Sequence, residues 1–218
     1  MQAVIFDLDG VLADTAELHY ESWRALAVEM EIPFDRRVND EMRGLSRPES
    51  LAVFLRGRET EYSDQSRAQL LDRKNDAYLR GVAELNPTDA LPGARALLTG
   101  LRARGARVAV ASSSRNARLV IERLGLGSLL DAIVDGNAVP DSKPDPRVFL
   151  EAAKQIDAAP KQCVVVEDAE AGVQAARAAG MRVIGIGPAQ RLGRADLVVA
   201  ALRELSAATV LEVLTRDG

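Results

Sequence analysis

The sequence predicts an α/β protein whose core is a doubly wound parallel sheet. Three observations carry this prediction. Short apolar runs recur along the chain, each bounded by polar or Gly residues, which is typical of buried strands. From about residue 91 onward these runs alternate with helical segments, as parallel strands joined by crossover helices require. Residues 14–86, in contrast, show helical periodicity and no convincing strand, which indicates a helical insertion.

The first predicted strand covers residues 3–6. The others cover residues 107–111, 132–134, 162–166, 182–187 and 197–199, and the helices among them cover residues 116–124, 147–156, 169–179 and 204–214. Gly125 and Gly180 follow two of these helices, where glycine is the preferred residue, and Pro146 suits the first turn of a third. Cys163 is the only cysteine and lies in an apolar run, so we expect it to pack as a small core residue rather than act as a thiol.

The helical insertion follows the first strand directly. Its predicted helices cover residues 15–30, 35–42, 48–56 and 63–79, and Asp14 or Thr15 is a suitable N-cap for the first. Because the insertion separates the first strand from the rest of the sheet, we predict two domains. Residues 1–13 and 87–218 would form the α/β core, and residues 14–86 would form a helical cap.

The composition bounds the possible partners. The chain has 218 residues, of which 47% are hydrophobic, so it can bury one sizeable core with a smaller second domain. A formal net charge of −4 argues against nucleic acid, which needs a basic surface. No apolar run reaches the ~20 residues of a membrane span, and the N-terminus lacks the basic segment of a signal peptide. We therefore expect a cytoplasmic protein with no membrane or nucleic-acid partner.

Polar side chains follow four of the predicted strands, at the ends of the strands or in the loops beyond them. They are Asp7 and Asp9 after the first strand, Ser112 after the second, Lys143 in the loop after the third, and Glu167 and Asp168 after the fourth. The carboxyl ends of parallel strands meet at one edge of a sheet, so we expect these groups to converge. Asp7 and Asp9 are two residues apart in extended chain, so both point toward the same spot.

These residue types together favour phosphoryl transfer. The carboxylates of Asp7, Asp168 and Glu167 suit Mg²⁺, which prefers oxygen ligands. Lys143 can neutralise a phosphate oxygen, and the Ser112 hydroxyl can donate to another. One carboxylate can act as a nucleophile and form an acyl phosphate, while another moves the proton of a substrate hydroxyl.

The same residues resemble the four motifs of the haloacid dehalogenase (HAD) superfamily of phosphotransferases. The motifs are Asp7-Leu8-Asp9-Gly10-Val11, Ser112, Lys143-Pro144 and Glu167-Asp168, in this order along the chain. The resemblance implies a HAD-like core with Asp7 as the phosphorylated nucleophile and Asp9 as the general acid–base. It also implies that Asp7, Glu167, Asp168 and the Asp9 carbonyl hold Mg²⁺. Ser112 and Lys143 would orient the transferring phosphoryl group.

The insertion is similar to the helical cap of the β-phosphoglucomutase family. The similarity rests on Asp14-Thr15-Ala16-Glu17 with His19 and Trp23, on Arg43-Gly44-Leu45-Ser46-Arg47, and on Arg73-Lys74-Asn75-Asp76. It implies that Arg47 grips the distal phosphate of the substrate, that Lys74 contacts the sugar, and that Thr15 and His19 couple cap closure to Asp9. The other implied substrate-binding residues are Trp23, Gly44, Leu45, Ser46, Asn75, Ser114, Arg115 and Asn116. Arg115 and Ser113 depart from the pattern, where Lys and a smaller residue are usual.

The activity implied by this resemblance is that of a β-phosphoglucomutase. Such an enzyme interconverts β-D-glucose 1-phosphate and β-D-glucose 6-phosphate through an aspartyl-phosphate, with β-glucose 1,6-bisphosphate as intermediate and phosphorylating activator. The alternative is a Mg²⁺-dependent sugar-phosphate phosphatase of the same superfamily, against which His19, Arg47 and Lys74 argue. A third hypothesis is a non-catalytic binding domain. Such a domain would not need the complete set of acids, which argues against it. Without the resemblance, His19 is an ordinary helix residue and Trp23 a core residue. We expect a monomer, because the cap must move freely.

Overall fold

The computed structural model describes residues 2–215 and confirms the α/β architecture. Its centre is a six-stranded parallel sheet in the order β3-β2-β1-β4-β5-β6. The strands are β1 (Ala3–Phe6), β2 (Arg107–Ala111), β3 (Ala132–Val134), β4 (Cys163–Glu167), β5 (Arg182–Ile186) and β6 (Leu197–Val199). Each lies where the sequence predicted a strand. Because β1 is central, the residues that follow it lie in the middle of the carboxyl edge.

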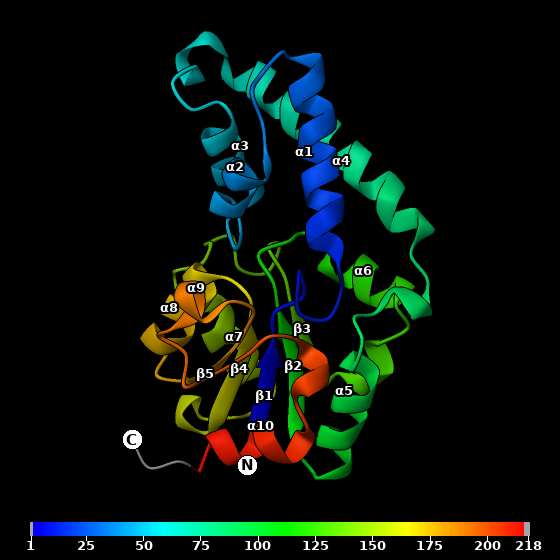
Figure 1. The fold of residues 1–218 in the computed structure, drawn as a ribbon, viewed down its shortest axis with the longest axis vertical. Coiled ribbons are helices and arrows are strands. Elements are labelled where there is room, and N and C mark those ends of the chain that lie inside the picture. The colour runs from blue at the N-terminus through cyan, green and yellow to red at the C-terminus, as the bar shows by residue number, and fades with distance from the viewer. Residues whose placement is uncertain (1, 216–218) are drawn as a thin grey trace.

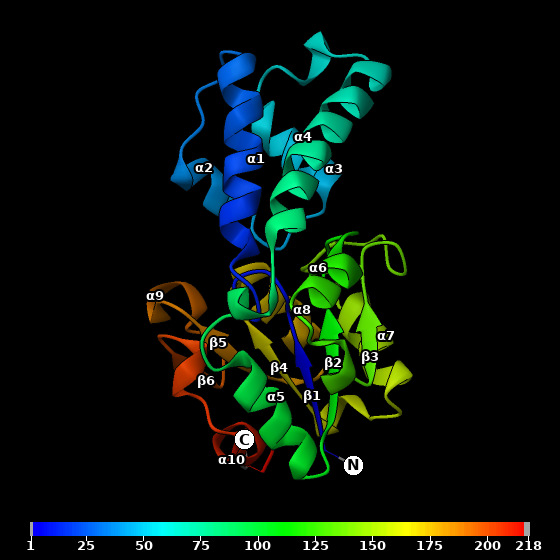
Figure 2. The same cartoon turned by 90° about the vertical axis from the view of Figure 1, so that its right-hand side faces the viewer.

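Helices cover both faces of the sheet (Figures 1 and 2). One face carries α5 (Ala94–Ala103), α6 (Ala117–Arg123) and α10 (Ala207–Val213), and the other carries α7 (Arg147–Gln155) and α8 (Glu170–Ala178). The short helix α9 (Ala189–Leu192) follows β5. Single 3₁₀ turns occupy Glu59–Glu61, Pro87–Asp89, Gly127–Leu129, Pro160–Gln162 and Leu202–Glu204.

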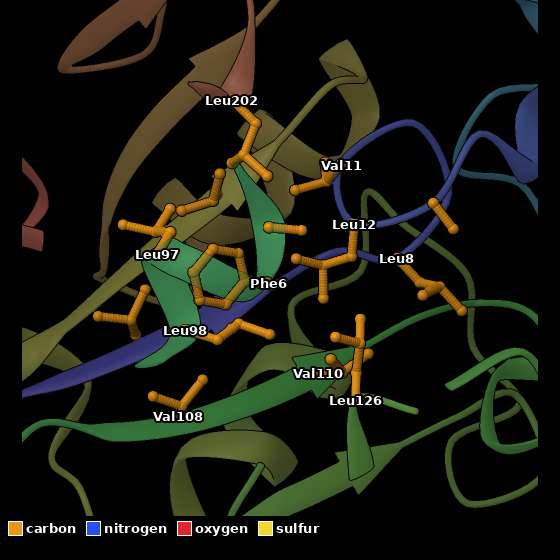
Figure 3. Close-up of a cluster of buried hydrophobic side chains, with 14 of the residues drawn as sticks. Phe6, Leu8, Val11, Leu12, Leu97, Leu98, Val108, Val110, Leu126 and Leu202 are labelled. Carbon is orange, nitrogen blue, oxygen red and sulfur yellow. The ribbon is translucent and has the colours of Figure 1, made fainter. Parts of the chain in front are cut away.

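The strand side chains alternate between two apolar clusters, as the two-residue period of a strand requires. Val4 and Phe6 face the first cluster, and Ala3 and Ile5 face the second. Figure 3 shows Phe6 in the first cluster among side chains of α5 and β2. Cys163 is fully buried in the second cluster, as expected, and its thiol donates to the carbonyl of Ala159 at 3.3 Å.

Helices α1 (Thr15–Glu29), α2 (Arg36–Glu41), α3 (Arg47–Phe54) and α4 (Asp64–Glu84) follow β1 and lie together beyond the carboxyl ends of the strands (Figure 1). They enclose an apolar cluster of their own, which includes Trp23, Phe54 and Leu70. The chain enters and leaves this helical region at neighbouring points, because Ala13 forms an antiparallel bridge with Ala90. The domain boundaries proposed for residues 14–86 stay a prediction.

Several helices differ from the prediction. Helices α5 and α9 were not predicted, although α5 contains the apolar positions of an amphipathic helix. Helix α4 extends to Glu84 rather than to residue 79, and α10 begins at Ala207 rather than at residue 204. Ser206 caps α10 by accepting a hydrogen bond from the Thr209 amide, which fixes the later start. None of the helices between residues 2 and 215 combines the length and apolar composition that crossing a membrane requires.

Candidate active site

Three buried carboxylates converge where β1 and β4 end. Phe6 pairs with Val166 in the sheet, so Asp7 lies beside Glu167 and Asp168. One carboxylate oxygen from each of the three residues lies within 4.8 Å of the others. Burial, and then the negative charge of Asp7, raise the pKa of Glu167 and that of Asp168 above their ordinary values. A site in which negative charge is this costly is suited to a divalent cation with oxygen ligands.

Two glycines leave the room that this acid cluster needs. A Cβ on Gly10 would lie 2.3 Å from Oδ2 of Asp168, and the φ of +81° at Gly10 is itself in the region that favours glycine. A Cβ on Gly172, in the first turn of α8, would lie 2.1 Å from Cδ of Glu167. The backbone therefore closes around the two carboxylates, and the residues present fit the Mg²⁺ that the motifs imply.

Lys143 is the buried counter-charge of the cluster. Its side chain is inaccessible, and its ammonium donates to Oδ1 of Asp7, to Oε2 of Glu167 at 3.0 Å and to the carbonyl of Ala111 at 3.4 Å. Burial by itself would lower the pKa of Lys143, but Asp7 and Glu167 outweigh it and hold that pKa above its ordinary value. Lys143 is therefore charged at neutral pH and offsets part of the charge of the acids.

Asp9 lies at the junction between the sheet and α1. The hydroxyl of Thr15 donates to its Oδ1, and the hydroxyl of Ser112 approaches its Oδ2 at 3.4 Å. Burial and the neighbouring charge of Asp7 raise the pKa of Asp9 to about 6, against the opposing effects of Thr15 and of Lys143. A carboxyl group with a pKa this close to neutral can both release and accept a proton under ordinary conditions.

His19 and Lys74 approach Asp9 from the helical region. Nζ of Lys74 lies 2.6 Å from Nδ1 of His19, and Nε2 of His19 lies 3.7 Å from Oδ1 of Asp9. The His19 ring stacks on Tyr78 with centroids 4.2 Å apart. Burial, followed by the charges of Lys74 and Arg47, lowers the pKa of His19 well below its ordinary value. Burial and Arg47 likewise lower the pKa of Lys74 to about 7.

These groups open into one cavity between the helical region and the sheet. Most of the predicted site residues line it, namely Asp7, Asp9, His19, Trp23, Gly44, Leu45, Ser46, Arg47, Lys74, Ser114, Arg115, Glu167 and Asp168. The other predicted residues lie outside its lining and are Thr15, Asn75, Ser112, Asn116 and Lys143. Of these, Thr15, Ser112 and Lys143 are buried behind the two aspartates, and Asn116 donates to Asn75 at 2.9 Å.

The cavity has a cationic side formed by two arginines. Arg47 is the first residue of α3, and Arg115 lies in the loop after β2. Arg47 and Arg115 both line the cavity, and burial, followed by the charge of Arg115, lowers the pKa of Arg47. Both remain charged, because arginine does not lose its proton in proteins. The cavity thus joins a carboxylate cluster to a region suited to an anionic group.

The structure adds residues that the sequence did not single out as site residues. Arg43 reaches from the end of α2 to Asp168, and Tyr78 supports the ring of His19. Tyr78 lies four residues after Lys74 on α4, so the helical period could have indicated it. Two further contacts join the loop after α2 to the sheet: the Ser46 amide donates to the Ser142 hydroxyl at 3.0 Å, and the Ser113 hydroxyl donates to the carbonyl of Gly44 at 3.0 Å. No local pattern connects these distant segments.

Comparison with known proteins gives consistent results. Residues 1–180 match the model of the haloacid dehalogenase-like hydrolases. The chain is 44% identical over 208 residues to a β-phosphoglucomutase of Bacillus subtilis (strain 168), covering 94% of this chain and 92% of that protein. It is 31% identical over 217 residues to a phosphorylated carbohydrates phosphatase of Thermotoga maritima, covering 98% of each. A crystal structure of a β-phosphoglucomutase from Clostridium difficile superimposes with a TM-score of 0.95 at 34% identity, covering 99% of this chain and 97% of that one.

Proposed function

The chain belongs to the haloacid dehalogenase-like hydrolases, and we propose that it acts as a β-phosphoglucomutase. The observation that carries this proposal is the cavity itself. Its lining combines the aspartate pair, the arginines Arg47 and Arg115, and the His19–Lys74 pair, which lies against Asp9. A sugar bisphosphate needs such a site, because one phosphate must meet the nucleophile while the other is bound a sugar's length away.

We propose that Asp7 is the nucleophile. A carboxylate oxygen of Asp7 would attack phosphorus of β-glucose 1,6-bisphosphate, forming an acyl phosphate as the bond from phosphorus to the sugar oxygen breaks. The glucose phosphate that is released would be replaced by β-glucose 1-phosphate with its 6-hydroxyl toward the phosphoaspartate. Attack by that hydroxyl would return the phosphoryl group to sugar and regenerate both Asp7 and the bisphosphate.

Asp9 would move the proton in both halves of this cycle. It would protonate the leaving sugar oxygen in the first half and accept the proton of the attacking hydroxyl in the second. Its pKa of about 6 suits this exchange of roles. Thr15 and Ser112 contact its two carboxylate oxygens and would orient it.

Asp7, Glu167 and Asp168 are the side chains that would hold Mg²⁺, with the Asp9 carbonyl as a further ligand. When bound, the ion would stabilise the negative charge on the transferring phosphoryl oxygens. Lys143 holds Asp7 and Glu167 in place from the buried side and would balance the same charge. With a phosphoryl group bound, the Ser112 hydroxyl would turn its one hydrogen from Asp9 to a phosphoryl oxygen.

The helical region would choose the acceptor. Arg47, with Ser114, Arg115 and Asn116, would bind the distal phosphate, and Lys74 would contact the sugar. Enclosing the cavity would keep water from the acyl phosphate, which otherwise reacts as in a phosphatase. Because the residues proposed here all come from one chain, we propose that a monomer is active.

A phosphatase is the second candidate, and the Thermotoga maritima relative is the observation that favours it. The two candidates differ in the group that accepts the phosphoryl from Asp7. We would incubate the protein with β-glucose 1-phosphate, Mg²⁺ and a trace of β-glucose 1,6-bisphosphate, and measure glucose 6-phosphate and free phosphate together. A mutase yields glucose 6-phosphate with little free phosphate, and Asp7→Asn should abolish the reaction. Stoichiometric phosphate release without isomer would reject the mutase and leave the phosphatase.

A further inference from the structure

An arginine from the helical region contacts one of the three acids of the carboxylate cluster. Nη1 of Arg43 donates to Oδ2 of Asp168 at 2.7 Å, and Nε of Arg43 donates to Oδ1 of Asp40 at 2.9 Å. The side chain of Asp168 is 10% exposed and that of Arg43 is 28% exposed, so the ion pair with Asp168 is shielded from water. This contact joins the loop after α2 to the end of β4.

The small carboxylate of Asp168 both pairs with Arg43 and belongs to the acid cluster, and it has little room to keep these two interactions apart. The oxygen that accepts from Arg43 is the one that lies against Gly10, where a Cβ would come within 2.3 Å. The same carboxylate contributes an oxygen to the cluster with Asp7 and Glu167. A cation held by the cluster and the Arg43 guanidinium would therefore sit on one small anionic group, where two positive charges repel each other.

Arg43 has a second partner that remains when Asp168 is taken. Asp40 lies three residues before Arg43 and is half exposed, so it can keep the guanidinium after the contact with Asp168 is broken. The ion pair between the loop after α2 and the end of β4 can thus be released to a cation without leaving Arg43 unpaired.

We propose that Arg43 and a divalent cation compete for Asp168, so that cation binding loosens the contact between the residue 43 loop and the sheet. By reciprocity, closure through Arg43 weakens cation binding by the same factor. A phosphate group entering the cavity adds negative charge and allows both cations to remain. Firm closure over a metal-loaded site then depends on bound substrate. This last step rests on the proposed function, whereas the competition itself does not.

The test is Mg²⁺ binding by the full chain without sugar, measured by titration calorimetry with MgCl₂. Arg43→Met keeps the length of the side chain and removes its charge, and we expect its Kd for Mg²⁺ to be about tenfold lower than that of the unchanged protein. Arg43→Lys keeps the charge and should stay close to the unchanged protein. Arg56→Met is the matched control, because Arg56 pairs with Glu41 on the exposed surface of the same region, and its Kd should not change.

Small-angle scattering provides a second measurement that needs no variant. We expect the radius of gyration of the unchanged protein to rise when MgCl₂ is added, and that of Arg43→Met to be the same with and without it. Unchanged or weaker Mg²⁺ binding by Arg43→Met would overturn the competition, the weaker binding showing that Arg43 positions Asp168 for the metal. A radius of the unchanged protein that does not respond to MgCl₂ would overturn it as well. Free phosphate as the product of the sugar assay would reject the mutase alone.

Discussion

Nζ of Lys74 lies 2.6 Å from Nδ1 of His19, a distance at which one nitrogen must donate and the other accept. When Lys74 is charged it can only donate, so in that state His19 accepts at Nδ1 and carries its own hydrogen on Nε2. That nitrogen faces Oδ1 of Asp9 at 3.7 Å. The pair therefore directs a hydrogen toward the proposed acid–base, and it connects α4, α1 and the end of β1.

The first prediction concerns this pair. His19→Ala removes the group that connects Lys74 to Asp9. We therefore expect the position of Asp9 to depend less on whether sugar is bound. The ratio of glucose 6-phosphate to free phosphate should fall, because water competes better for the acyl phosphate. Arg24→Ala is the control on the same helix, since Arg24 pairs with Glu21 at the surface. An unchanged ratio in His19→Ala would remove His19 from this role.

Asp9→Asn tests the proton transfer. The amide keeps the size of the side chain but cannot exchange the proton, so we expect turnover to fall by about 10²–10⁴-fold while substrate still binds. Turnover and substrate binding would be measured separately, with Asp14→Asn as the control because Asp14 is exposed and its side chain caps nothing. Near-normal turnover in Asp9→Asn would assign the proton to another group.

Lys74 gives a prediction of stability against pH. Its pKa falls from 10.5 to about 7 in the folded protein, mainly through burial. Between these values the unfolded chain binds a proton that the folded protein has released, so the free energy of unfolding should rise with pH across this window. Lys74→Met has no titrating group at this position, so its free energy of unfolding lacks this rise with pH. At pH 6 we expect it to be more stable than the unchanged protein by about 1–4 kcal/mol, with the difference shrinking toward pH 10.

Urea unfolding at several pH values would measure this difference. Lys154→Met is the control, because the Lys154 side chain is 80% exposed and its replacement should not change the pH dependence. Lys74→Met should also lose sugar-phosphate affinity, so the residue would trade stability for binding. A pH-independent difference between Lys74→Met and the unchanged protein would contradict the lowered pKa.

Gly172→Ala tests the fit of the acid cluster. Alanine would normally favour a helix over glycine by about 1 kcal/mol. Here the added methyl group would meet the Glu167 carboxylate at 2.1 Å, and crowding of this kind costs about 1–3 kcal/mol. We expect a net loss in the free energy of unfolding together with weaker Mg²⁺ binding. Gly127→Ala has no atom within 4 Å of its added carbon and should change neither quantity. Tighter Mg²⁺ binding by Gly172→Ala would show that the carboxylate is not confined.

The sequence predicted the strands and the converging acids well, for physical reasons. Buried strands of a parallel sheet are continuous apolar runs, and β1 and β4 stand out for that reason. Once the sheet is parallel, the positions of Asp7, Lys143 and Asp168 near one edge follow from topology. Their proximity is therefore a consequence of the fold class and needs no knowledge of side-chain packing.

Helix lengths could not be predicted where packing overrides local preference. Gly100 lies in the middle of α5 and disfavours a helix, but a Cβ there would come within 3.3 Å of Ala207 in α10, so its absence allows close packing. Gly81 has the same effect in α4, where a Cβ would lie 2.8 Å from Leu18 of α1. In both helices the contact that compensates for glycine is distant in sequence. The contact of Arg43 with Asp168 could not be predicted for the same reason, because the two residues are distant in sequence.

The bridge between Ala13 and Ala90 joins the helices α1–α4 to the sheet at one place, so this helical segment can be exchanged as a unit. Both crossings between the sheet and the helices α1–α4 pass this one pair of residues, just beyond the loop that carries Asp9. A chimera that replaces residues 14–86 with the corresponding segment of a relative would have to match only this junction and the loop contacts above the sheet. The choice of phosphoryl acceptor could then evolve by exchange of one continuous segment, while the chemistry at Asp7 is inherited unchanged.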